Sequence, residues 1–106
     1  MPAAAPTTRG KTKVYRFGDI EILLTPNEIG VYTAIHIPNP SHEPMTFSIS
    51  VRVKGPGGYA ALMNRKFPSV RPRDTAREGG LLIDHGNAPV PGDPVPEIVS
   101  FEQKPS

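Results

Sequence analysis

The chain of 106 residues contains neither cysteine nor tryptophan. Without cysteine it has no disulfide framework, no thiol nucleophile and no metal site of the cysteine-containing kinds. No apolar run approaches the roughly 20 residues that a membrane-spanning helix needs, and none has the form of a signal-peptide core. No apolar pattern of helical period extends beyond about two turns, which argues against a helical bundle.

Two segments with alternating apolar residues flank a turn rich in proline, asparagine and serine. Such strict alternation indicates strands that are buried on one face only. The apolar positions are Val31, Ile35 and Ile37 before the turn, with Thr33 in the same register, and Met45, Phe47, Ile49, Val51 and Val53 after it. These two segments predict an antiparallel β protein with one core.

Further short apolar segments alternate with turn residues along the chain. About seven strands at such spacing are typical of an all-β sandwich, with a small closed barrel as the alternative. The expected strands cover residues 11–17, 20–25, 30–37, 45–54, 59–64, 75–84 and 97–103. Residues 65–73 are expected to form a loop or an edge, and a helical turn is an alternative for Ala60–Met63. We expect a bulge at Gly79–Gly80, and a last strand that buries Val99 and Phe101, or Ile98 in the other register.

The domain organisation is simple. Residues 1–10 are rich in alanine, proline and threonine and lack periodicity, so we expect them to form a disordered arm. Residues 11–106 are expected to fold as a single domain, because free-standing domains of this size are common. The net charge of +2 favours solubility and is by itself poor evidence for nucleic-acid binding.

No motif in the sequence points to catalysis or to a cofactor. The three histidines, His36, His42 and His85, would form a metal site only if the fold brought them together, since no pair has ligand spacing. Asp84-His85 lies in a segment of turn composition, and the chain has no nucleophile elbow. We therefore predict no enzyme, no metal and no cofactor, with a small metal-dependent enzyme that uses the histidines as an alternative.

The strongest candidate site is a basic segment. Seven basic residues lie between Arg52 and Arg77 against the single acidic Asp74, and acidic residues dominate from Glu78 onward. Clustered arginines bind carboxylates or phosphates through paired hydrogen bonds. The predicted partner-binding residues are Arg65, Lys66, Arg71, Arg73 and Arg77. The competing interpretation is a solvated surface whose charges are balanced by neighbouring acids.

The segment Val31–Ile37, the following Pro-Asn-Pro-Ser-His-Glu-Pro, the strand Met45–Val53, the Phe67–Thr75 segment and the closing Val99–Glu102 together resemble a known group. They are similar to the small immunoglobulin-like domains of bacterial envelope and secreted proteins, the FxLYD-type group. The resemblance covers residues 20 to 103. It implies an immunoglobulin-like sandwich that acts as an interaction or accessory domain in the envelope or outside the cell, with no shared catalytic residue.

The function predicted from these features is non-enzymatic binding of a protein partner through strand edges and the Arg65–Arg77 region. A nucleic-acid-associated small β-barrel is an alternative, although few aromatic residues lie among the basic ones. A homodimer formed through exposed strand edges is a further alternative, because open sandwiches have edges that pair.

Overall fold

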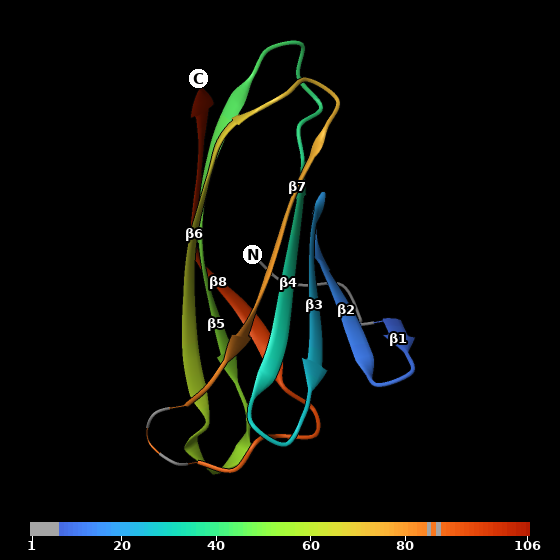
Figure 1. The fold of residues 1–106 in the computed structure, drawn as a ribbon, viewed down its shortest axis with the longest axis vertical. Coiled ribbons are helices and arrows are strands. Elements are labelled where there is room, and N and C mark those ends of the chain that lie inside the picture. The colour runs from blue at the N-terminus through green and yellow to red at the C-terminus, as the bar shows by residue number, and fades with distance from the viewer. Residues whose placement is uncertain (1–6, 85, 87) are drawn as a thin grey trace.

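The computed structural model describes residues 7–84, 86 and 88–106, which contain eight β-strands and one short 3₁₀-helix. Figure 1 shows them as an elongated two-layered molecule. The strands are β1 (Thr7–Arg9), β2 (Thr12–Phe17), β3 (Ile20–Pro26), β4 (Val31–Pro38), β5 (Met45–Lys54), β6 (Ala60–Val70), β7 (Thr75–Leu82) and β8 (Val95–Pro105), and the 3₁₀-helix η1 is Pro56–Gly58. Among these residues no helix is long and apolar enough to cross a bilayer.

The strands form two separate sheets in which every neighbouring pair is antiparallel. Sheet A has five strands in the order β1-β2-β3-β4-β7, and sheet B has three in the order β6-β5-β8. The all-β sandwich predicted from the sequence is therefore confirmed, with eight strands where about seven were expected. The closed-barrel alternative is wrong, because the two sheets do not join into one.

The core lies between the sheets and includes the alternating residues that the sequence identified. Phe47, Ile49 and Val51 of β5 face Ile35 and other inward residues of sheet A, and each of these four side chains is at most 2 % exposed. Full burial of a side chain of this size contributes about 1.5–3 kcal/mol. Thr33 is also buried, and its hydroxyl donates to the carbonyl oxygen of Val31 at 3.2 Å, so the one polar member of the β4 face is satisfied.

The structure decides between two pairs of alternatives in the second half of the chain and corrects one prediction. Of the loop or edge expected over residues 65–73, the edge holds for 65–70, which continue β6 at the edge of sheet B, where Phe67 pairs with Phe47 and supplies the next inward side chain. The helical turn at Ala60–Met63 does not form, since these residues pair with β5. The β7 register runs unbroken through Gly79 and Gly80, so no bulge occurs there.

The last strand and the first residues also differ in detail from expectation. The bulge lies in β8, where the register shifts at Val99 and turns this side chain outward, 47 % exposed. Ile98 and Phe101, on either side of the bulge, both pack against the core. The bulge therefore combines the two expected registers, with Phe101 inward from one and Ile98 inward from the other. Thr7–Arg9 form β1 on the edge of sheet A, so the arm expected over residues 1–10 is wrong for these three; residues 1–6 lie outside the described part of the chain.

Candidate functional site

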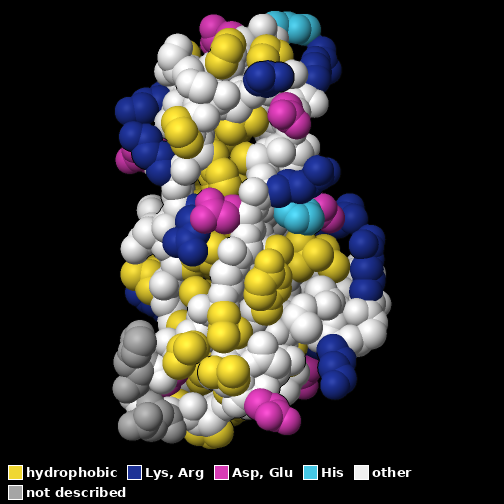
Figure 2. Space-filling model, viewed as in Figure 1, with side chains coloured by type: hydrophobic (Ala, Val, Ile, Leu, Met, Phe, Trp, Pro, Cys, Tyr) yellow, Lys and Arg dark blue, Asp and Glu magenta, His cyan; other side chains and the backbone are white. Residues whose placement is uncertain are grey.

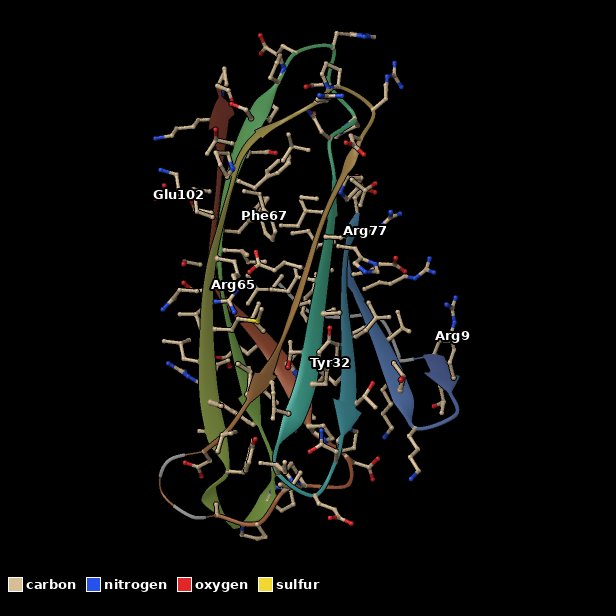
Figure 3. The ribbon with its side chains drawn as sticks, viewed as in Figure 1. Arg9, Tyr32, Arg65, Phe67, Arg77 and Glu102 are labelled. Atoms are coloured by element: carbon tan, nitrogen blue, oxygen red, sulfur yellow. The ribbon has the colours of Figure 1, made fainter. Side chains whose placement is uncertain are left out.

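The five predicted basic residues follow one edge of the sandwich, formed by β6, the turn after it and β7. They point in different directions. Arg65 pairs in register with the inward-facing Ile49, whereas Lys66 pairs with Ser48 on the outer face of sheet B. Arg77 lies on the outer face of sheet A, and Figure 3 shows it and Arg65 on the two neighbouring strands. The fold therefore does not unite the predicted residues on one surface.

Arg65 forms an ion pair that joins the two sheets. Its buried Nε lies 2.8 Å from Oε1 of Glu78 on β7, off the N–H direction, so the contact is electrostatic and not a hydrogen bond. A side chain on Gly80 would come within 3.2 Å of the Arg65 guanidinium, so glycine leaves room for it. Inward-pointing charges at an edge discourage pairing with another strand. We assign Arg65 to closing this edge.

Arg71 and Arg73 lie in the β6–β7 turn, which Asn39 organises. The buried Asn39 side chain donates from Nδ2 to the carbonyl oxygens of Val70 and Glu43, at 2.9 and 3.0 Å. Its backbone accepts from the N–H of Arg73 at 2.9 Å, and Arg73 has a positive φ of 64°. The two arginine side chains themselves are exposed at this end of the molecule. The sequence carried no sign of this structural role, because Asn39 lies in a segment of ordinary turn composition.

Charged side chains form a row across the outer face of sheet A. In register from β2 to β7 they are Arg16, Glu21, His36 and Arg77. Glu21 lies 3.2 Å from Arg16 and 3.8 Å from Nδ1 of His36. Arg77, at the end of the row, forms no ion pair within the described part of the chain. The guanidinium of Arg77 is thus the member of this row that is open to an external carboxylate.

Below this row, exposed apolar side chains continue along β7. Tyr32 pairs in register with Leu81, and the two are 48 % and 39 % exposed. Ile83, just past the end of β7, is 42 % exposed. The Tyr32 hydroxyl group and ring lie over Gly79, where an added Cβ would approach the hydroxyl oxygen to 2.4 Å. We call Arg77, Tyr32, Leu81 and Ile83 the β7 stripe.

Figure 2 shows the same arrangement as a surface: hydrophobic side chains gather below a band where basic, acidic and histidine side chains meet. Figure 3 places Tyr32 and Arg77 along the same face. Of the β7 stripe, the sequence indicated only Arg77. The sequence analysis did not identify the apolar members of the stripe, because Tyr32 meets the other two only through the pairing of β4 with β7, which lie about forty residues apart in the chain. The one local signal was the run Leu81-Leu82-Ile83, which breaks the alternation.

The outer face of sheet B carries both polar side chains and exposed apolar ones such as Leu62. It carries a shallow depression of about 370 Å³ whose floor and walls include Ser48, Ser50, Asn64 and Glu102. On the same face Glu97 lies 3.1 Å from Arg52 and 3.3 Å from Lys54. These two basic residues of the predicted basic segment are therefore balanced by a neighbouring acid, as the competing interpretation expected.

The described residues contain no group of three histidine, aspartate or glutamate side chains close enough to hold a metal ion. His36 lies in the charged row of sheet A, and His42 lies in the exposed loop between β4 and β5. His85, the third histidine considered, falls outside the described residues. No protein-family model, curated protein or solved structure gives a significant match to this chain.

Proposed function

We propose that this protein is a non-enzymatic interaction module that binds a partner protein through the β7 stripe. The observation that supports the proposal is that Tyr32, Leu81 and Ile83 are exposed next to one another on the outer face of sheet A. Arg77 lies at one end of this apolar group and forms no ion pair within the described residues. Contiguous apolar patches rimmed by polar residues mark protein-binding sites. Tyrosine and arginine are also the residue types that carry most binding energy at interfaces.

The chemistry of the stripe defines its partner. An apolar centre calls for an apolar surface on the other protein, and the Arg77 guanidinium calls for a carboxylate at one end of it. A nucleic acid would require several basic side chains on one face. The basic residues of this edge face three directions, and Arg65 is already paired with Glu78. The geometry therefore favours a protein with an acidic rim over a nucleic acid.

The test compares two exposed leucines. Leu81 lies in the stripe, and Leu62, 52 % exposed on the outer face of sheet B, is its matched control. Affinity capture from a lysate of the source cells would use the wild-type protein, Leu81→Glu and Leu62→Glu. We expect a polypeptide that the wild type and Leu62→Glu recover in equal amounts and that Leu81→Glu loses.

A second measurement locates the contact. A photoreactive amino acid at position 81 is expected to crosslink to the captured polypeptide, and the same amino acid at position 62 is not. Because a charged rim is screened by salt, Arg77→Glu should weaken capture more at low than at high ionic strength. Equal capture by Leu81→Glu and Leu62→Glu would contradict the assignment of the partner site to the β7 stripe.

A further inference from the structure

A second feature lies on the opposite side of the sandwich from the β6–β7 edge. There an apolar cleft of about 240 Å³ opens between the sheets, beside the turn that joins β2 and β3. Its lining includes Phe17, Ile20, Ile37, Phe47, Phe101 and Gln103. The rings of Phe47 and Phe101 stack with centroids 6.0 Å apart and form one wall. For scale, an engineered apolar cavity of about 150 Å³ takes up benzene.

The cleft arises because the two sheets differ in length on this side. In sheet A, β2 ends at Phe17 and β3 begins at Ile20, and the last β3–β4 pair joins Glu21 to His36. In sheet B, the pairing of β5 with β8 continues to Met45 and Pro105. In Figure 1, β8 accordingly continues upward beyond the β2–β3 turn. Within the described residues, the end of sheet B therefore has no facing strand here.

The side chain of Gln103 shows the consequence. It pairs in register with Phe47, which places it on the inward face, yet it is exposed. Phe101, the inward residue before it, is only half-buried, whereas its stacking partner Phe47 is 1 % exposed. Within the described residues, no element covers the inward face of β8 at Phe101 and Gln103.

The outer edge of β8 is also open. β8 pairs only with β5 in the described structure, and beyond the Val99 bulge it continues regularly over Ser100–Lys104. The other edge of sheet B, β6, carries Pro68 and the inward Arg65, which both hinder strand addition.

We infer that β8 receives an extended segment of a partner polypeptide, which pairs with Ser100–Lys104 and inserts an apolar side chain into the cleft. Main-chain hydrogen bonds would supply affinity, and the cleft would select alternate side chains of the segment. Glu102 lies on the outer face of β8 and Asp19 at the cleft, and neither forms an ion pair within the described residues. The segment is thus expected to alternate valine, isoleucine or leucine with lysine or threonine.

The test uses a synthetic nine-residue peptide that alternates isoleucine or valine with lysine or threonine and carries a fluorescent label. Its control replaces the central isoleucine with proline, which removes an N–H and breaks strand pairing. We expect saturable binding of the first peptide and at least tenfold weaker binding of the control, measured by anisotropy. In ¹⁵N-labelled protein, shift changes should concentrate in Ser100–Lys104, in the β2–β3 turn and at Ile37.

Two substitutions test the contacts. Glu102→Lys should weaken binding of the lysine-bearing peptide about three- to tenfold at low salt, whereas Glu28→Lys, the same charge change in the β3–β4 turn, should not. Phe101→Ala should weaken peptide binding at least tenfold. If this substitution destabilises the fold, the comparison of Glu102→Lys with Glu28→Lys still tests the inference. Leu81→Glu, which tests the β7 stripe, should leave peptide binding unchanged.

Other results would overturn the inference. Equal binding of the proline control, equal effects of Glu102→Lys and Glu28→Lys, or shift changes centred on β7 would each show that the segment does not add to β8. Self-association of the protein without peptide, with shift changes in Ser100–Lys104, would assign the edge to a second copy of this chain and not to a foreign segment.

Discussion

The two long sides of the sandwich differ in the polar contacts that join the two sheets. On the β6–β7 side, polar contacts join the two layers at three levels: Asn39 at one end, the Arg65–Glu78 ion pair midway, and the hydroxyl of Tyr59, which donates to the carbonyl oxygen of Leu82 at 2.7 Å. On the β8 side, the described residues show similar contacts only near the start of β8, where the hydroxyl of Tyr15 donates to the carbonyl oxygen of Pro94 at 3.1 Å and Lys13 pairs with Asp93.

The two sides therefore differ in how readily they would accept another strand. An edge that is closed by inward charges and buried hydrogen bonds resists addition of another strand. The β8 edge beyond the Val99 bulge has a regular backbone beside an apolar cleft, and it lacks inward charges and buried hydrogen bonds of this kind within the described residues. The β7 stripe adds a second surface, since it lies on the outer face of the closed side and does not depend on the edge itself.

On the closed side, the largest expected effect comes from Asn39. Asn39→Ala leaves the carbonyl oxygens of Val70 and Glu43 without their donor in a buried setting, which should cost about 3 kcal/mol of unfolding free energy. Asn27→Ala is the matched control, because Asn27 also caps a turn but is exposed, and it should cost about 1 kcal/mol or less. Urea denaturation measures both. Similar losses in the two variants would contradict the role given to Asn39.

On the open side, the stacked pair of phenylalanines should respond unequally. Phe47→Ala empties a buried site and should cost about 3–5 kcal/mol, whereas Phe101→Ala, at the half-open cleft, should cost about 1–2 kcal/mol. Thermal and urea denaturation would give both values. A cost for Phe101 as large as for Phe47 would mean that the cleft is closed in solution.

The ion pair that closes the β6–β7 edge should matter more for association than for stability. Both side chains are about one-third or more exposed, so Glu78→Leu alone should cost only about 1 kcal/mol. The double variant Arg65→Leu with Glu78→Leu should recover that stability, because it leaves no unpaired charge. It should, however, form oligomers, which light scattering would detect. A double variant that stays monomeric would show that other features protect this edge.

The smallest expected effect is a pH dependence from Tyr59. Burial raises the pKa of its hydroxyl above the ordinary value of 10.0. Because the folded pKa lies above the unfolded one, the stabilising contribution of the neutral hydroxyl is complete below pH 10 and is lost as the pH rises through the folded pKa. Tyr59→Phe should therefore reduce the loss of stability as the pH rises above about 10, measured by urea denaturation. An unchanged pH profile would contradict this assignment.

Alternating apolar residues predicted most of the strands and the inward faces of β4 and β5, because alternation at period two is a local property of the chain. The sequence also placed Arg77 among the candidate residues. It left residues 65–73 open between a loop and an edge, because Pro68 and Pro72 interrupt the segment, and it placed a bulge at Gly79–Gly80 where pairing with β4 keeps the register regular.

Which charged and apolar side chains meet depends instead on how the strands pair and the sheets pack. The contact of Arg65 with Glu78, the overlap of Tyr32 with Gly79 and the hydrogen bonds of Asn39 all join residues that are distant in sequence. The cleft depends on the unequal lengths of two sheets, a property of their registers and not of any segment. Local patterns determine the strands, whereas the pairing of strands and the packing of sheets determine the surfaces.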